Sequence, residues 1–424
     1  MNTKQPLNIP AIAVMYLLFF MIAFVTNFAG SMGVILKNQY AISNAMTQLG
    51  SLANFLAYAC MGIPAGVILR NKGYKFTSLL AVGIGLVGVA IQWLSGTVGG
   101  FYMYVFGAFI AGFSMCMLNI VVNPMLNTLG GGGNRGNQLI QFGGSCNSIG
   151  GTLAPILLGY LIGGEMATAQ VADAAPAMLT AMAIFVVAFL VILFSHIPEP
   201  HIETPEQRAA RVAKKDKYSP ISFRHFLLGA IAIFFYVGVE VGIPNMANLY
   251  MSNNPLVGPT IAGTVVGIYW LCMMFGRLMG GAFGGKVSAR IMLTSVCLVA
   301  IVLLTTIMFL PETATIHFKG TQLPISMLLM VICGLCTSVM WGTIFNLSTE
   351  GLGKHTPTAS GIFMALVCGG GIIPFIQGGI ADLFGGADKA YLYSYIVLII
   401  CLIYILFYAL VGSKNVNKDI PTEF

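Results

Sequence analysis

The stretch PEPHIETPEQRAARVAKKDKYSPISFRH, residues 198–225, decides how this chain of 424 residues is organised. It is the one long polar stretch in a sequence in which 57% of residues are hydrophobic and only 8% are charged. Apolar regions of similar length precede and follow it. We therefore expect an N-terminal half over residues 1–197, a linker over 198–224 and a C-terminal half over 225–424.

The composition excludes a water-soluble globular protein, because too few polar residues are present to cover its surface. A helix needs about 20 apolar residues to cross a bilayer, and the sequence contains twelve such spans. They cover 9–36, 46–69, 76–96, 101–126, 138–163, 175–197, 225–251, 260–285, 288–310, 323–349, 357–384 and 390–412. The short alternating segments of a β-barrel are missing. We predict an all-α membrane protein with six spans in each half.

The basic residues predict how the chain is oriented, since Lys and Arg are retained on the cytoplasmic side. With both termini inside, only Lys37, Lys319 and Lys389 of the 20 basic residues lie outside, which leaves 17 inside. The asymmetry favours an even number of spans and a place in the cytoplasmic membrane. The retention of basic residues on the cytoplasmic side also accounts for the net charge of +7. We therefore do not interpret this charge as a nucleic-acid surface and expect no nucleic-acid partner.

The two halves carry weakly similar features. Pro155 and Gly159 in the fifth span correspond to Pro374 and Gly378 in the eleventh, and a pair of glycines precedes each proline. Similar halves in parallel orientation, with a solute site between them at the middle of the membrane, describe the major facilitator architecture.

Six motifs then resemble those of one known family. They are GIPAGVILRNKGYK at 62–75, the Asn-Pro pair at 123–124, CNSIG at 146–150, Tyr-Trp at 269–270 followed by Gly-Arg at 276–277, GTIFNLSTEGLGKHT at 342–356 and GGGIIPFIQGGIAD at 369–382. Together they resemble the fucose, galactose and glucose symporter family of the major facilitator superfamily. The resemblance covers nearly the whole chain and implies a transporter for a neutral sugar.

The sequence also departs from that family. Proton-coupled transport by a well-known member is associated with one acid in the first helix and another in the fourth. Here the span 9–36 contains no acid, and Asn119 stands at the position of the second. A glutamine of the fifth helix is replaced by Gly144, although Gln141 lies one turn earlier.

Glu240 is the candidate for cation coupling. A lone ionisable group near the bilayer centre costs about 2.5–3.5 kcal/mol on insertion scales, so it is a candidate for function. It lies in VGVEVGIPN at 237–245, where Pro244 is expected to break or kink the helix and to free carbonyl groups for a ligand or cation. The alternative is a structural carboxyl. Its natural partners Arg277 and Lys354 are expected near the cytoplasmic face, too far away to pair with it.

Neutral polar and aromatic side chains inside the spans are the candidates for substrate binding. Amides offer both donors and acceptors to sugar hydroxyls, and aromatic rings can cover the C–H faces of a pyranose. The candidates are Asn27, Asn119, Asn123, Gln141, Asn147, Asn245 and Gln377, with the aromatic residues Tyr236, Tyr269, Trp270 and Trp341. Each amide could instead link two helices, a contact worth about 0.6 kcal/mol. Arg70, Arg277 and Glu350 are the candidates for gating.

The leading hypothesis is a secondary transporter that imports a neutral sugar by alternating access of the two halves. Proton coupling would depend on Glu240, sodium coupling could use carbonyls near Pro244, and a uniporter needs neither. Export of amphipathic compounds is the alternative within transport, and a sensor built on a transporter scaffold is another. An enzyme would need paired acids or metal-spaced histidines, which the spans do not contain. We expect no cofactor, a sugar, a cation and the lipid bilayer as partners, and a monomer.

Overall fold

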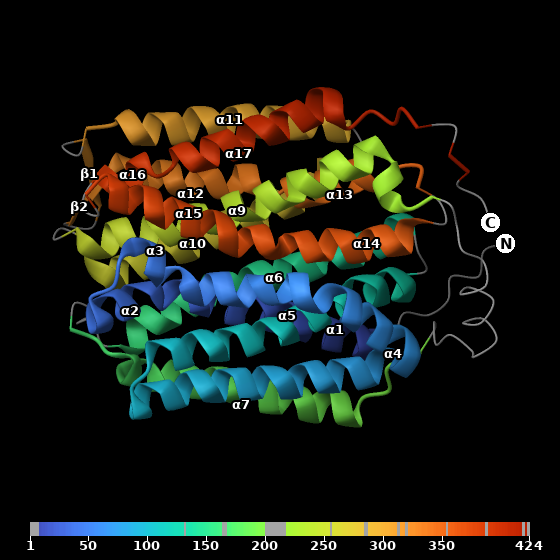
Figure 1. Cartoon of the computed structure of the whole chain (residues 1–424), viewed down its shortest axis with the longest axis horizontal. Coiled ribbons are helices and arrows are strands. Elements are labelled where there is room, and N and C mark those ends of the chain that lie inside the picture. Colours follow the sequence, from blue (N-terminus) through green and yellow to red (C-terminus); the bar gives the residue numbers. More distant parts are fainter. Residues whose placement is uncertain are drawn as a thin grey trace.

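The computed structural model describes residues 8–130, 133–162, 168–199, 218–254, 257–283, 287–311, 314–318, 321–352, 355–385, 389–417 and 420–421. They form a bundle of helices with one small hairpin of strands (Figure 1). Residues 200–217 of the predicted linker lie outside the described residues.

The first elements contain one helix that is longer than any predicted span. They are α1 (Ile9–Ser31), α2 (Gly33–Tyr40), α3 (Asn44–Thr47) and α4 (Leu49–Val98). Within α4, Gly73 has φ 84° and ψ 178°, a conformation that is not helical and that glycine adopts without strain. Gly73 therefore divides α4 into two membrane spans, as predicted.

The remaining elements up to the linker are α5 (Phe101–Leu129), α6 (Gly133–Leu161), the 3₁₀ helix η1 (Val171–Ala174) and α7 (Ala175–Phe194). They pack closely because several helices meet at glycine. A methyl group on Gly112 of α5, for example, would collide with the backbone carbonyl of Asn54 in α4.

The elements after the linker are more often interrupted. They are η2 (Pro220–Ser222), α9 (Arg224–Asn253), α10 (Gly258–Phe283), α11 (Ala289–Phe309), β1 (Thr315–Phe318), β2 (Thr321–Pro324), α12 (Ile325–Thr337), α13 (Met340–Thr349), α14 (Thr356–Ala365), η4 (Leu366–Cys368), α15 (Gly369–Leu383), α16 (Lys389–Tyr393), α17 (Ile396–Phe407) and η5 (Tyr408–Gly412). The two strands pair antiparallel, with Thr315 opposite Pro324. The sequence did not predict this hairpin.

The described elements are consistent with twelve membrane-spanning segments. Ten described segments are long and apolar enough to cross a membrane. The division of α4 at Gly73 adds one, and the 29 residues of α6 add another. Large apolar side chains such as Phe194 and Leu383 are more than 80% exposed on the surface, where lipid would cover them. The all-α multi-pass prediction is confirmed.

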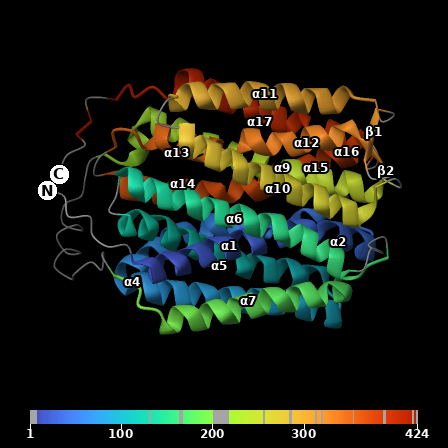
Figure 2. The same ribbon diagram turned by 180° about the vertical axis from the view of Figure 1, so that it is seen from behind.

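In Figure 1, the elements from α1 to α7 lie together below those from α9 to α17. Figure 2 shows α6, α10 and α14 in the middle, where the two groups meet, and α6 packs along α10. We call these groups the N-terminal and C-terminal halves. One end of the bundle carries β1 and β2, and we call it the hairpin end. The opposite end, which carries Gly73 and the start of α9, is the linker end.

Candidate functional site

An ion pair lies inside the bundle where the two halves meet. The Nη2 atom of Arg277 on α10 is 3.1 Å from Oε1 of Glu240 on α9. The Arg277 side chain is 14% exposed and that of Glu240 is 11% exposed, so both charges are largely withdrawn from solvent. Glu240 is near the middle of α9, as the sequence predicted.

The expectation that Arg277 lies too far from Glu240 is wrong. Each Cα–Cβ bond of a helix tilts toward the N-terminus of that helix. Since α10 begins at the hairpin end, its side chains incline away from the linker end. The long Arg277 side chain therefore reaches back from the last third of α10 toward the middle of the bundle, where Glu240 accepts its hydrogen bond.

The guanidinium of Arg277 also contacts the other half of the molecule. Its Nη1 atom donates to the backbone carbonyl of Gly144, at 2.9 Å, and to Oγ of Ser148, at 3.2 Å. Both acceptors belong to α6. Arg277 thus joins α9 and α10 of the C-terminal half to α6 of the N-terminal half, which makes it more central than the gating position expected for it.

The expected break at Pro244 is absent, because α9 continues through this residue without a non-helical position. Proline has no N–H, so the carbonyl of Glu240, four residues earlier, receives no hydrogen bond from position 244. The hydroxyl of Tyr269 on α10 donates to that carbonyl instead, at 3.0 Å. The carbonyl that was expected to be free for a cation thus accepts one hydrogen bond from a neighbouring helix.

The predicted tenth span is interrupted instead. The helix α12 ends at Thr337 and α13 begins at Met340. The hydroxyl of Tyr236 donates to the carbonyl of Thr337, at 3.1 Å, and Tyr269 Oη lies 3.1 Å from Thr337 Oγ1. The hydroxyl groups of Tyr236 and Tyr269, two candidates for substrate binding, therefore form hydrogen bonds with backbone carbonyls of neighbouring helices.

A second cluster at the boundary of the halves contains Trp270, Asn27 and Gly151. A methyl group on Gly151 would lie 3.0 Å from the Trp270 ring and 3.2 Å from Nδ2 of Asn27, so the three residues are in contact. Asn27 donates to the carbonyl of Ala23 in its own helix, at 2.9 Å. Trp270 is only 4% exposed, and its indole Nε1 has no hydrogen-bond partner among the described residues.

Three candidate amides lie within the N-terminal half. Asn147 on α6 donates to the carbonyl of Phe19 on α1, at 3.0 Å, and Asn119 on α5 donates to the hydroxyl of Tyr58 on α4, also at 3.0 Å. Asn123 donates to the carbonyl of Asn119, at 2.9 Å. The contacts of Asn147 and Asn119 join two helices, whereas that of Asn123 lies within α5. The side chain of Gln141 lies outside the described residues.

The other candidates lie in the C-terminal half. Asn245 donates to Oε1 of Gln48, at 2.9 Å, and so links α9 to the N-terminal half. Gln377 is fully buried beside Gly242, and neither of its amide atoms has a partner among the described residues. The Trp341 ring packs edge-on against those of Tyr236 and Phe363, with centroids 6.3 and 5.8 Å apart.

At the hairpin end, polar contacts tie the halves together. The carboxylate of Asp382 on α15 accepts the backbone N–H groups of Asn44 and Ala45, at 2.8 and 2.9 Å. The ammonium of Lys37 on α2 donates to Oδ1 of Asn44, at 2.7 Å, and to the hydroxyl of Tyr391 on α16, at 2.5 Å. We call these five residues the hairpin-end latch.

Two expected gating residues lie at the linker end. Arg70 precedes Gly73 in α4. Glu350 follows α13, and its backbone carbonyl lies 2.9 Å from Nε2 of His225, in the same half. Arg277, the third expected gating residue, instead reaches Glu240 and α6.

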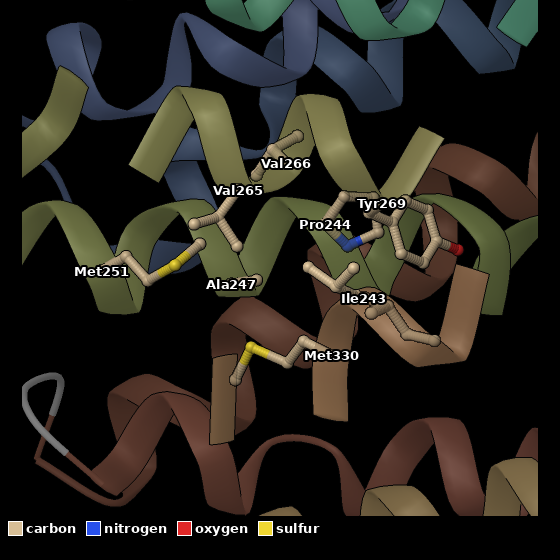
Figure 3. Close-up of a pocket in the computed structure, with 9 residues that line it drawn as sticks. Ile243, Pro244, Ala247, Met251, Val265, Val266, Tyr269 and Met330 are labelled. Carbon is tan, nitrogen blue, oxygen red and sulfur yellow. The ribbon is translucent and has the colours of Figure 1, made fainter. Parts of the chain in front are cut away.

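A small apolar pocket lies between α9, α10 and α12, inside the C-terminal half (Figure 3). Its lining includes Pro244, Met251, Val265, Met330 and the Tyr269 ring. The Tyr269 hydroxyl is at the end of the ring away from Val265 and Met251. The pocket has no charged side chain in its lining, and it offers little to a sugar.

A family model described as Major Facilitator Superfamily matches residues 13–374. A glucose/galactose transporter of Brucella abortus is 31% identical over 412 residues, which cover 96% of this chain and 94% of that protein. The L-fucose-proton symporter of Escherichia coli is 22% identical over 409 residues, with 88% and 87% covered.

Solved structures have the same fold. The FucP transporter in its outward conformation aligns with a TM-score of 0.66 at 20% identity, over 95% of this chain and 99% of that one. A D-xylose-proton symporter aligns with a TM-score of 0.72 at 12% identity, over 96% and 99%.

Proposed function

The chain belongs to the major facilitator superfamily, and from that premise we propose that it imports a neutral hexose or a related sugar by alternating access, coupled to protons. The observation that carries the sugar is the similarity to the Brucella abortus glucose/galactose transporter along 96% of the chain. The resemblance of its motifs to a sugar symporter family supports the same substrate class.

The proposed orientation places the hairpin end outside and the linker end in the cytoplasm, with both termini cytoplasmic. Lys37 and Lys389 lie at the hairpin end, in α2 and at the start of α16. Arg70, Arg224 and Arg290 belong to the linker end, and the positive-inside rule assigns that end to the cytoplasm of a cell's inner membrane. One chain carries both halves of the site, so a monomer is sufficient.

The sugar is proposed to bind between the halves, beside Trp270. The Trp270 indole N–H is a buried donor without a described partner, and such a group costs free energy until it is paired. A sugar hydroxyl would pair it, while Asn27, Asn147 and Trp341 contribute amides and an aromatic ring. The proposed sugar-binding residues also include the other candidate amides, which are Asn119, Asn123, Gln141, Asn245 and Gln377.

Coupling is proposed to depend on protonation of Glu240. A proton on Glu240 removes the negative charge that holds Arg277 against α9. The guanidinium keeps its contacts with Gly144 and Ser148 on α6, so protonation changes how the halves are tied. Protons are favoured over sodium as the coupling ion because the L-fucose-proton symporter is among the relatives of this chain.

Alternating access requires that contacts at each end form and break in turn. We propose that the hairpin-end latch closes the outer side in the present state. Arg70 and Glu350 are proposed to act at the inner side, and Arg277 between the two.

Counterflow in proteoliposomes tests the substrate assignment. Vesicles loaded with unlabelled glucose, galactose, fucose or N-acetylglucosamine should take up the same labelled sugar for at least one of the four. Trp270→Phe keeps an aromatic ring but removes the N–H, so the half-saturation concentration should rise by roughly tenfold, the value of one buried hydrogen bond. Trp93→Phe on α4 is the matched control and should leave it unchanged. Absence of counterflow for every sugar would contradict the proposal.

A further inference from the structure

Three tyrosine hydroxyls hold the backbone around Glu240. Tyr269 donates to the carbonyl of Glu240, Tyr236 to that of Thr337 and Tyr395 to that of Ile243, at 3.0, 3.1 and 3.1 Å. Each tyrosine is at most 2% exposed. Tyr269 and Tyr395 both donate to a carbonyl of α9, but only the carbonyl bound by Tyr269 lacks its usual helical donor.

The acceptor of Tyr269 has lost its helical donor. In a regular helix, the carbonyl of Glu240 would bind the N–H of residue 244, which is a proline and has none. The carbonyl of Ile243 faces Ala247, which retains its N–H. The hydroxyl of Tyr269 therefore replaces a missing backbone donor, whereas that of Tyr395 adds to a complete pair. Figure 3 shows the Tyr269 ring beside Pro244.

The same helix holds both the backbone and the side chain of Glu240. Tyr269 and Arg277 are eight residues apart on α10, and this spacing places them near one face of the helix, about two turns apart. Tyr269 contacts the main chain of Glu240, and Arg277 contacts its carboxylate. Two anchors on α10 thus fix the position of one residue on α9.

The helix interruption joins this arrangement through Thr337. Its Oγ1 atom lies 3.1 Å from the Tyr269 hydroxyl, and its carbonyl accepts from Tyr236, which lies one turn before Glu240 on α9. The end of α12 is therefore held by the same two tyrosines. Loss of the Tyr269 hydroxyl would remove the contacts of α10 with the α9 backbone and with Thr337 on α12, while Tyr236 would still join α9 to α12.

We propose that Tyr269 is a positioning residue whose hydroxyl takes the place of the N–H that Pro244 lacks and thereby holds Glu240 against Arg277. The inference rests on the proposed function in one respect, which is the role of Glu240 in coupling. Its structural part is independent of the substrate.

A rescue experiment tests the proposal. Tyr269→Phe removes the hydroxyl, and Pro244→Ala supplies a backbone N–H that can bind the same carbonyl. In proteoliposomes with a proton gradient, Tyr269→Phe should lower the ratio of sugar accumulation to counterflow by roughly tenfold, as expected for one buried hydrogen bond. The double variant Tyr269→Phe, Pro244→Ala should recover this ratio. The melting temperature of the detergent-solubilised protein should likewise fall in Tyr269→Phe and recover in the double variant.

Tyr395→Phe is the matched control. It removes a buried hydroxyl that also binds an α9 carbonyl, but Pro244→Ala should not rescue it, because the carbonyl of Ile243 never lost its helical donor. A double variant as defective as Tyr269→Phe in accumulation would overturn the proposal, since the hydroxyl would then act on something other than this carbonyl. Recovery of the melting temperature without recovery of the ratio would overturn the role in coupling. If the wild-type protein moves no sugar, the proposed function fails, while the cycle of melting temperatures still tests the contact.

Discussion

Glu240 is an acid in the middle of a membrane-spanning helix, where Arg277 compensates its negative charge. A buried ion pair contributes little net stability, because desolvation of both charges offsets their attraction. Removal of one partner is different, since it leaves an uncompensated charge and costs about 3–5 kcal/mol. The pair is thus better explained by a role in function than by a need for stability.

The cost of an unpaired buried charge predicts an order of stability among variants of the pair. Arg277→Met should lower the melting temperature of the detergent-solubilised protein strongly, and the double variant Glu240→Gln, Arg277→Met should regain most of the loss, because no charge is then left alone. Arg290→Met is the control. Arg290 binds the neutral Ser413, at 3.1 Å from Nε to Oγ, so its loss leaves no acid among the described residues without the ion pair that it had. A double variant no more stable than Arg277→Met would refute the account of the pair.

At the scale of single residues, the sequence predicted Glu240 but not its surroundings. Glu240 was recognisable because it is the one acid near the centre of a span. Its partner Arg277 was missed, because the position of a residue along a helix does not show where a long side chain reaches. Gln48 and Lys37 were missed because their contacts cross between the halves, which no local pattern reveals.

Among the helices, the positions of the irregularities were not predicted correctly from the sequence. Pro244 predicted a break or kink in α9, but the helix does not break, and a tyrosine from α10 donates to the carbonyl that lacks its helical donor. The interruption after α12 falls at Ser338 and Val339, where no glycine or proline marks it. Tyr236 satisfies a carbonyl at that point. Both outcomes depend on donors from other helices, and propensity within one segment carries no information about them.

Two matched carboxylates allow a test of the hairpin-end latch. Asp382 accepts the N–H groups of Asn44 and Ala45 across the two halves. Glu199, which follows α7, accepts those of Tyr74 and Lys75 within the N-terminal half, at 2.6 and 2.8 Å. The chemistry is the same, and only the connection between halves differs.

Asp382→Asn should therefore open the hairpin end, whereas Glu199→Gln should act locally. Hydrogen exchange in lipid nanodiscs should become faster in Asp382→Asn for peptides at Asn44–Thr47 and also for those at the ends of α9 and α16. Glu199→Gln should speed exchange only near Tyr74. If Asp382→Asn changes exchange at Asn44–Thr47 alone, the carboxylate is a local cap and does not latch the halves.

At the scale of the whole molecule, hydropathy was sufficient for the architecture. The predicted spans 101–126, 175–197 and 225–251 correspond to α5, α7 and α9 with ends shifted by a few residues. Hydrocarbon requires long apolar helices, so the count follows from composition. The packing of α6 along α10 and the closure at the hairpin end could not be predicted, since both depend on which face of each helix meets the other half.

Accumulation of labelled sugar in proteoliposomes shows whether transport is coupled to a cation through Glu240. Uptake would be measured with an inward proton gradient, with a sodium gradient and with neither, for the wild-type protein and for Glu240→Gln. The account predicts that the wild-type protein concentrates the sugar only with the proton gradient, and that Glu240→Gln retains counterflow but does not concentrate it. Equal accumulation by Glu240→Gln, or accumulation by the wild-type protein with sodium alone, would contradict the account.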